Sequence, residues 1–328
     1  MSVKRLLRYS FAAGAAVGLY AFAQTRMFVV RHRVFRYDSG NLLQGAQGSS
    51  KKLRILHISD LHLLAHQKRK IQWVQSLAAH SPDFIVATGD FLSSVSALPA
   101  LRQTLSVFTG IPGVFVYGSN DYYAPRAKNP FSYFGLSASM DEESYGALNK
   151  LPVDDLTDFL VGSLGWLNIN NSRSYLKVSG VDIECVGVDD PHIERDCLPG
   201  DEERSKGNDI FRIGVAHAPY SRVLNSFVRK GCQMIFAGHT HGGQVRIPGV
   251  GALVTNCDMP TNLVSGTFEW PYRAGDVHEG NATIEVSRLV DYSGESAYVN
   301  VSAGLGTSPF APVRLGVPPE AIIYDVYV

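Results

Sequence analysis

The chain has 328 residues, of which 45% are hydrophobic, 18% charged and 10% aromatic, and thirty basic residues balance thirty acidic ones. This length fits one large α/β domain with insertions, and the composition excludes collagen-like, repeat and disordered chains. The neutral balance argues against a general nucleic-acid binder, which normally carries a basic face, so we expect no nucleic-acid partner. The four cysteines form no CxxC pair, which excludes the usual zinc-finger and redox motifs.

The first element that the sequence predicts is an N-terminal membrane anchor or signal segment over residues 1–38. Its apolar run FAAGAAVGLYAFA follows Lys4, Arg5 and Arg8 and is thirteen residues long, whereas a bilayer span takes about twenty. Three interpretations stay open. An uncleaved anchor would make the protein cell membrane-associated, with its side undecided because basic residues flank both ends. The small-x-small ending at residues 21–23 equally fits a signal peptide, whose cleavage would export the protein. The third is an ordinary packed helix.

Residues 39–52 are rich in Gly, Ser and Gln and are predicted to be a linker that leads into a folded domain over residues 53–328. The start of this domain alternates apolar, strand-like runs with helical patterns. Such alternation predicts βαβ units and a largely parallel sheet. The predicted strands lie at residues 53–58, 83–88 and 113–117, and the helices at residues 69–79 and 97–108.

The middle of the domain, about residues 123–166, is less regular and is predicted to be an insertion with one helix at 153–164. A hairpin split by Gly180 is expected next. The chain then offers more strand-like runs than one wound sheet needs, so the residues favour an α/β fold with two sheets. These runs lie at residues 211–216, 234–238, 252–256, 297–303 and 321–328.

Polar side chains follow five of the predicted strands at the point where each strand ends. Because parallel strands bring their carboxyl ends to one edge of a sheet, residues about 180 positions apart can meet there in one cleft. The residues concerned are Asp60, His62, Asp90, Asn120, Asp121, His217, His239 and His241.

Two pairs in this set, Asp60 with His62 and His239 with His241, have i, i+2 spacing. Residues at this spacing in extended chain point the same way, so each pair can grip one metal ion. Carboxylate, imidazole and amide donors without thiolates suit Mn²⁺, Fe or Zn²⁺.

The order D-x-H, G-D, G-S-N-D, H and G-H-T-H resembles that of the calcineurin-like metallophosphoesterases over about residues 53–328. The forms GHTHGGQ, GVDDPH and VSAGLGTSPFAPVR resemble the bacterial membrane-associated branch described as phosphodiesterases or phosphohydrolases. The resemblance implies a four-layer α/β/β/α sandwich of two mixed sheets with two divalent metal ions between them, in agreement with the surplus of strands.

The resemblance also implies a role for each matching residue. Asp60, His62 and His241 would hold the first ion, His217 and His239 the second, and Asp90 would bridge the two. Two ions about 4 Å apart can lower the pKa of a bound water so that it becomes a bridging hydroxide, and can clamp phosphate oxygens during in-line attack. No nucleophilic side chain is then required, which fits the lack of a GxSxG motif.

The chain departs from the family pattern at one place. The family pattern has Asn followed by His, whereas this chain has Ser119 followed by Asn120. Ser119 occupies the ligand position, but an amide oxygen is the better neutral ligand, so we expect Asn120 to reach the second metal. Asn cannot act as a general acid. Protonation of the leaving group would come from water or from another histidine, for which His192 is the candidate, while Asp121 would orient the loop.

The hypothesis is therefore a metal-dependent phosphoester hydrolase that favours phosphodiester or pyrophosphate-linked substrates, including lipid or nucleotide conjugates that it would meet near a membrane. Arg126 and Lys128 are further candidates for contact with a substrate phosphate. Two alternatives remain: a phosphoprotein phosphatase, and a non-catalytic scaffold that retains the fold. The departure at residues 119 and 120 is the feature that favours the scaffold.

Overall fold

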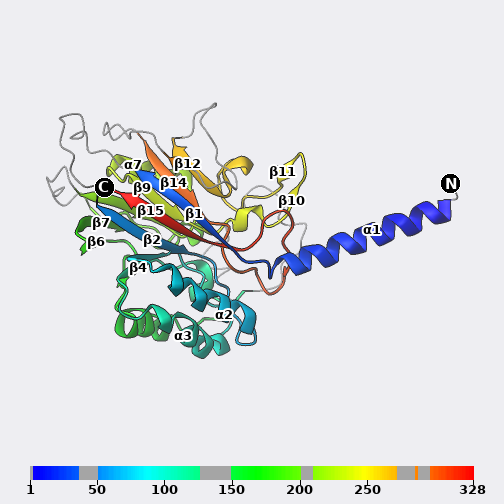
Figure 1. Cartoon of the computed structure of the whole chain (residues 1–328), viewed down its shortest axis with the longest axis horizontal. Helices are drawn as coiled ribbons and strands as arrows, with labels where there is room; N and C mark the ends of the chain where they lie inside the picture. The colour runs from blue at the N-terminus through cyan, green and yellow to red at the C-terminus, as the bar shows by residue number, and fades with distance from the viewer. Residues whose placement is uncertain (1–2, 37–50, 126–148, 201–209, 272–284, 287–295) are drawn as a thin grey trace.

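The computed structural model of the chain describes residues 3–36, 51–125, 149–200, 210–271, 285–286 and 296–328. Within these ranges the strands form a seven-stranded sheet, a six-stranded sheet and a small two-stranded one. Both large sheets mix parallel and antiparallel neighbours, as the sequence predicts. Figure 1 shows them side by side, with helices outside them and one long helix that extends away from the rest.

The seven-stranded sheet consists, in spatial order, of β13 (Glu285–Val286), β1 (Val29–Arg36), β15 (Glu320–Tyr327), β2 (Lys52–Ile58), β3 (Phe84–Ala87), β4 (Gly113–Phe115) and β5 (Leu167–Asn168). The six-stranded sheet consists of β12 (Gly266–Trp270), β14 (Ala297–Val301), β9 (Met234–Ala237), β8 (Phe211–Val215), β7 (Val181–Gly187) and β6 (Ser172–Val178). β10 (Arg246–Ile247) and β11 (Gly251–Ala252) form the small sheet.

Three apolar cores separate four layers of secondary structure. Alternate residues of a strand point to opposite faces of its sheet. On β2, Leu56 and Ile58 therefore pack against the helices, whereas Leu53 and Ile55 pack against the second sheet. The third core lies between the second sheet and α7 (Ser221–Arg229), through residues such as Phe227. The expected α/β/β/α order is thus confirmed.

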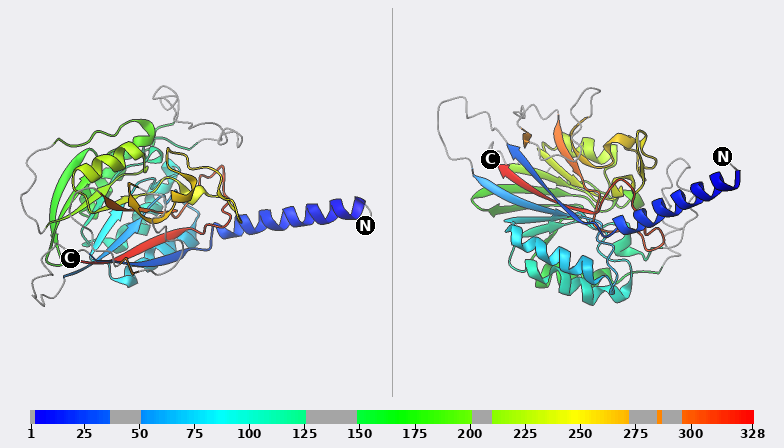
Figure 2. Two further views of the ribbon diagram at one scale, coloured as in Figure 1. Left: turned by 90° about the horizontal axis from the view of Figure 1, so that it is seen from above. Right: turned by 45° about the vertical axis from the view of Figure 1, so that its right-hand side comes forward.

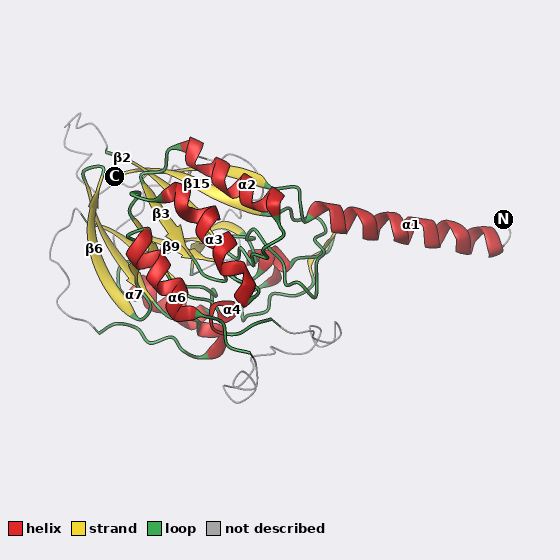
Figure 3. Ribbon diagram, turned by 90° about the horizontal axis from the view of Figure 1, so that it is seen from below, coloured by secondary structure: helices red, strands yellow, loops and turns green. Residues whose placement is uncertain are grey.

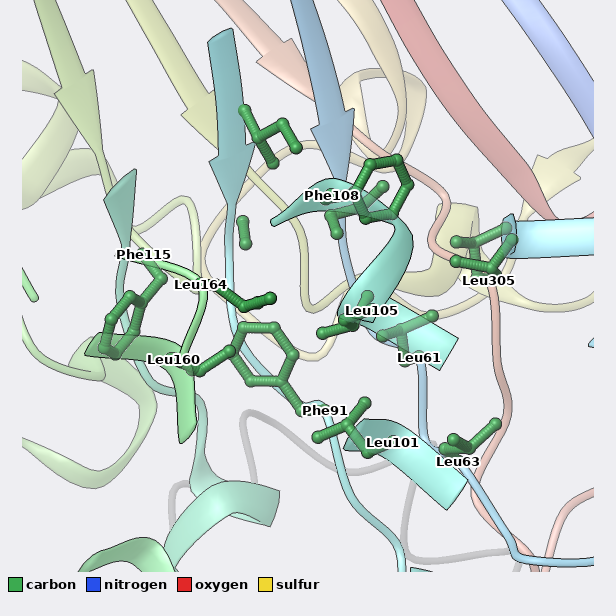
Figure 4. Packing of buried hydrophobic residues seen from close by; sticks show 14 of the residues in the cluster. Leu61, Leu63, Phe91, Leu101, Leu105, Phe108, Phe115, Leu160, Leu164 and Leu305 are labelled. Carbon is green, nitrogen blue, oxygen red and sulfur yellow. The ribbon is translucent and has the colours of Figure 1, made fainter. Parts of the chain in front are cut away.

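The outer helices that cover the first sheet are α2 (Lys68–Ser76), α3 (Leu98–Leu105) and α6 (Val153–Thr157), which continues as a π-helical turn over Asp158–Ser163. Figure 2 shows that α2 and α3 lie on the side of the sandwich opposite to α7, and Figure 3 shows α2, α3 and α6 over the first sheet. Their core includes Leu101, Leu105, Phe91 and Leu160 (Figure 4). The helix predicted at 153–164 is confirmed, with a widened second half.

The boundary predicted for the N-terminal segment is wrong. Residues 29–36, assigned with the rest of 1–38 to an anchor or signal, form β1, which pairs in parallel with β15 along its whole length. The chain therefore enters the folded domain before the predicted linker. Upstream, α1 (Val3–Gln24) is a helix whose last turn contacts the domain, where Ala21 and Gln24 are buried. Among the described residues, no helix combines the length and the apolar character that crossing a bilayer requires.

The linker expected at 39–52 lies outside the described residues except for its end, where Lys52 begins β2. Arg126 and Lys128 also lie outside them. The run at 252–256, expected as a strand, is mostly loop and contributes only Ala252 to β11. β12 was not predicted, because its alternation is short and its partner β14 lies about thirty residues further along the chain.

Candidate metal centre

The residues predicted from the strand ends meet at one edge of the sandwich. Asp60 and His62 follow β2, Asp90 follows β3, His217 follows β8, and the His239–His241 turn follows β9. Positive backbone φ angles occur at five of these non-glycine residues. The values are 49° at Asp60, 41° at His62, 56° at Asp90, 69° at His239 and 50° at His241. Such angles cost about 1–3 kcal/mol each and concentrate at functional sites, because they aim side chains that a regular strand end would not.

The first group of potential ligands consists of Asp60, His62 and His241, whose donor atoms lie within 4.8 Å of one another. The Nε2 atoms of His62 and His241 face each other at 3.2 Å, and Asp60 Oδ1 lies 3.8 Å from His241 Nε2. The two imidazole rings are stacked at 5.0 Å. Two ring nitrogens and a carboxylate oxygen thus converge on one point.

The second group consists of Asp60, Asp90 and His217, again with donor atoms within 4.8 Å. His239 joins it, since its Nδ1 lies 3.2 Å from His217 Nε2. Asp90 Oδ2 lies 3.5 Å from His217 Nε2 and 3.3 Å from His62 Nε2. Asp90 therefore faces both groups, as a bridging carboxylate would.

The outer ring nitrogens of three histidines are held by backbone carbonyl groups. His217 Nδ1 donates to Thr88 O at 2.6 Å, and His241 Nδ1 donates to Gly306 O at 3.2 Å. His239 Nε2 lies 3.0 Å from the backbone oxygen of Asn256 and 3.1 Å from its amide nitrogen. The carbonyl is the shorter contact and can only accept, so we place the proton on Nε2. Each inner nitrogen is then left with a lone pair that faces the centre, which is how metal-binding histidines are held.

The electrostatics of the centre also fit a cation. Burial alone would lower the pKa of His217, but Asp90, Asp190 and Asp60 together raise it to about 10. In return, despite the opposing effect of burial, His217 and His62 hold the pKa of Asp90 below its usual range. Burial lowers the pKa of His62 to about 4, which keeps this ring neutral. The carboxylates that favour a proton on His217 would equally favour a metal cation in its place. Imidazole and carboxylate groups are the donor set that Mn²⁺, Fe or Zn²⁺ accepts, so the residues fit the expected metal ions.

The structure places Asn120, rather than Ser119, against the carboxylate of Asp90. Both residues lie in the single turn α4 (Ser119–Tyr122). The backbone N–H of Asn120 donates to Asp90 Oδ1 and its side-chain amide donates to Asp90 Oδ2, each at 2.8 Å. Asp121 is fully buried beneath this turn and accepts from the backbone N–H groups of Asp90, Phe91 and Gly118 at 2.8, 2.8 and 2.9 Å. Asp121 thus ties the loops after β3 and β4 together.

The close packing of the loops around the centre requires glycine at several positions, among them Gly118 and Gly238. A Cβ atom at Gly118 would lie 2.3 Å from Asp90 Oδ1 and 2.6 Å from His217 Cε1. One at Gly238 would lie 1.9 Å from Ser59 Oγ and 2.5 Å from Asp60 Oδ2. Real Cβ atoms do not approach that closely, so the backbone itself forms part of the wall of the centre.

His192, the candidate acid, lies next to the centre rather than within it. Its ring is 4.3 Å from that of His239, and its Nδ1 lies 3.1 Å from the hydroxyl of Tyr220. It is 3% exposed and is held by its backbone N–H, which donates to Asp190 Oδ1 at 2.8 Å. His57, which the prediction does not include in the site, is buried and bonds to Asn300 and Thr88.

Sequence reasoning missed several residues that support the centre. Asp190 acts on His217 through space, Asn256 holds His239, and Arg314 contacts the loop that holds His241. The segments GVDDPH and VSAGLGTSPFAPVR carry part of the family resemblance, and each contains one of these residues. The apolar run at 252–256 predicts a strand, which hides Asn256, whereas the φ of 58° at this residue places it in a turn.

Comparison with known proteins agrees with this geometry. The family model of the calcineurin-like phosphoesterases matches residues 53–243. The uncharacterized metallophosphoesterase YkoQ of Bacillus subtilis (strain 168) is 22% identical over 202 residues, which are 60% of this chain and 64% of YkoQ. The match therefore spans less than two thirds of that relative. The uncharacterized protein YpbG of the same organism is 26% identical over 237 residues, 68% of this chain and 77% of YpbG.

Among solved structures, TT1561 of Thermus thermophilus matches with a TM-score of 0.40 and 12% identity over 77% of this chain and 90% of that one. Purple acid phosphatase PPD1 from yellow lupin seeds matches with a TM-score of 0.36 and 10% identity over 60% of this chain and 39% of that one. The family model covers more than half of the chain and includes each of the metal-ligand candidates after the strands. The chain belongs to the calcineurin-like phosphoesterase family.

Proposed function

We propose that the protein is a dinuclear-metal-dependent phosphoester hydrolase that favours phosphodiester or pyrophosphate-linked substrates. Family membership and the two ligand groups support metal-dependent phosphoester hydrolysis. The observation that carries the proposal is the arrangement of His217, His239 and His241. Each outer nitrogen is fixed by a carbonyl group. The inner nitrogens of His217 and His241 face carboxylates, and that of His239 faces the inner nitrogen of His217.

In this proposal, each residue of the metal centre has a defined role. Asp60, His62 and His241 would hold one ion and His217, His239 and Asn120 the other, with Asp90 shared between them. Divalent ions at such a centre supply Lewis-acid polarisation of the phosphoryl group and lower the pKa of water. The protein chain orients these donors, since Asp121 fixes the two loops and the carbonyl groups fix the rings. No side-chain nucleophile is required.

The nature of the leaving group follows from Asn120. An amide does not titrate in the useful range, so residue 120 cannot protonate a departing alkoxide. A phosphate or phenolate leaving group needs little protonation, which favours pyrophosphate-linked substrates and activated diesters. His192 is the candidate acid for less activated esters, since it lies beside His239 at the margin of the centre.

The test uses the full-length protein, stripped of metal and then loaded with Mn²⁺. Hydrolysis of bis-p-nitrophenyl phosphate, p-nitrophenyl phosphate, a dialkyl phosphate and a nucleoside diphosphate ester is compared. We expect metal-dependent cleavage of the activated diester and the diphosphate, with slower cleavage of the dialkyl ester. Asn120→Ala should lose most of this activity, whereas the neighbouring Ser119→Ala should retain it. Cleavage of the monoester alone, or cleavage that persists without metal, would refute the proposal.

We also propose that α1 associates the protein with a membrane. Large apolar side chains on this helix are exposed, among them Phe11 (81%) and Leu19 (72%), and Arg5 and Arg8 lie near its start. Apolar side chains together with basic ones favour the interface of an anionic bilayer. The full chain should float with vesicles that contain phosphatidylglycerol, and a variant with Phe11→Ser and Leu19→Ser should not. Equal flotation of both proteins would count against this role.

A further inference from the structure

One loop, residues 303–306 after β14, forms the wall of the centre next to the first ligand group. Leu305 N donates to Ser59 O at 3.0 Å. A Cβ atom at Gly306 would lie 2.4 Å from Leu61 O and 2.7 Å from His62 Cβ, so the loop touches the chain that carries Asp60 and His62. The carbonyl of Gly306 accepts the bond from His241 Nδ1. The position of this loop therefore decides where His62 and His241 lie.

Arg314 holds the loop from behind. Its side chain is 0% exposed, and its Nη2 donates to the carbonyl oxygens of Ala303, Gly304 and Gly306 at 2.6, 3.2 and 2.7 Å. The same nitrogen lies 3.4 Å from His241 Nδ1, which is longer than the 3.2 Å from that ring nitrogen to the carbonyl of Gly306, so we keep the proton on Nδ1. A single guanidinium thus bonds to three carbonyl groups of a four-residue loop. The flexible ammonium group of a lysine would reproduce this set of hydrogen bonds poorly.

The burial of this charge is costly and calls for an explanation. Arg314 Nε has no hydrogen-bond partner among the described residues, and Glu320 and Asp60 act on the guanidinium only through space. A buried cation that bonds to carbonyl groups instead of a carboxylate is a poor way to stabilise a fold. A role in positioning His241, a candidate metal ligand, would account for the burial of this charge.

The backbone around Arg314 connects the loop with two other elements. Arg314 N donates to Ala21 O in the last turn of α1 at 2.9 Å. The next residue, Leu315, donates to Gln244 O at 2.9 Å and accepts from Arg246 N at 2.8 Å, directly after the GHTHGGQ turn. Arg314 is therefore fixed on both sides, and its side chain has a defined place from which to hold the loop.

We propose that Arg314 is a positioning residue of the metal centre. It fixes loop 303–306 so that the carbonyl of Gly306 keeps the proton on His241 Nδ1 and leaves Nε2 free to bind the ion that His241 shares with Asp60 and His62. The proposal rests on the metal binding in the proposed function. It predicts that loss of the guanidinium weakens one of the two ions and spares the other.

The test compares Arg314→Lys and Arg314→Met in the full-length protein with a matched control, Arg54→Lys. Arg54 also makes several hydrogen bonds, to Asp325 and to the carbonyl of His80, but lies near the start of β2, away from the centre. Titration of metal-stripped protein with Mn²⁺ is followed by calorimetry, and folding by circular dichroism. Outer-shell partners of metal ligands typically change affinity by about 10–100-fold. We expect that loss for one ion in the Arg314 variants and for neither ion in the control.

A second readout does not depend on the variants. Nitrogen-15 spectra of the parent protein should show the His241 ring protonated on Nδ1. A ring protonated on Nε2 would overturn the proposal, even if an Arg314 variant failed to fold. Parent affinity for both ions in a folded Arg314 variant would overturn it as well, while leaving the proposed function intact. If the parent binds no divalent ion, the metal assignment itself fails and this proposal fails with it.

Discussion

Replacing Gly118 by alanine isolates the steric requirement of the metal centre. The backbone at Gly118 has φ −109° and ψ 173°, which any residue adopts, so the only consequence of the change is the added methyl group. That methyl would lie 2.3 Å from Asp90 Oδ1, whereas ordinary contacts begin at 3.4 Å. Asp90 must therefore move by about 1 Å, and overpacking of this kind costs roughly 1–3 kcal/mol of the free energy of unfolding.

The effect on metal binding should be larger than the effect on stability. Metal–ligand distances tolerate changes of only about 0.2 Å, so the displacement of Asp90 and His217 should weaken metal binding by at least ~10²-fold. Gly162→Ala is the matched control, because that position lies in a helical turn with nothing within 4 Å of the new Cβ. Urea denaturation and Mn²⁺ calorimetry measure the two quantities. A Gly118→Ala protein that binds metal as tightly as the parent would refute the close packing of Gly118 against Asp90 and His217.

Two further changes test the charges. Asp90→Asn keeps the shape of the side chain but removes the carboxylate that both metal ions would share. We expect metal-dependent hydrolysis to fall by at least ~10²-fold, since metal ions stabilise the transition state by several kcal/mol. Parent rates in a steady-state assay would contradict the role of Asp90 as a ligand of both ions. Although burial acts to raise the pKa of Asp325, the hydrogen bonds and charges of Arg54 and Lys52 lower it below the ordinary 3.8. A carboxyl whose pKa is lowered on folding stabilises the protein above its ordinary pKa, and this contribution is lost as the pH falls through the lowered value. Asp325→Asn should therefore cost about 1 kcal/mol at pH 7 and progressively less as the pH falls through the lowered pKa, measured by urea denaturation; a cost that does not change with pH would show that the ion pairs are not responsible.

The sequence predicted the positions of the strand ends well, because each apolar strand is followed by a short polar motif. It could not predict the positive φ angles of Asp60 or His239, which arise from contacts between loops. It also missed β1, because the run VVRHRVFR resembles the basic flank of a membrane segment. Only its pairing with β15, almost three hundred residues away, shows that it is a strand.

The sequence could not decide between Ser119 and Asn120 as the metal ligand, and the expectation of Asn120 stays a prediction. The spacing places serine at the ligand position, whereas the single turn α4 brings the amide of Asn120 to Asp90. Arg314 was equally hidden, because nothing in its local sequence indicates that it lies behind His241. Residues that contact the metal ligands through backbone carbonyl groups leave little trace in a sequence, since any residue can supply a carbonyl.

The measurement that tests the central claim most directly is anomalous diffraction from crystals of the full-length protein grown with Mn²⁺. We predict two anomalous peaks, one among Asp60, His62 and His241 and one beside His217 and His239, with Asp90 between them. One peak or none at saturating Mn²⁺ would contradict a dinuclear centre, and peaks elsewhere on the chain would contradict the assignment of these residues as its ligands.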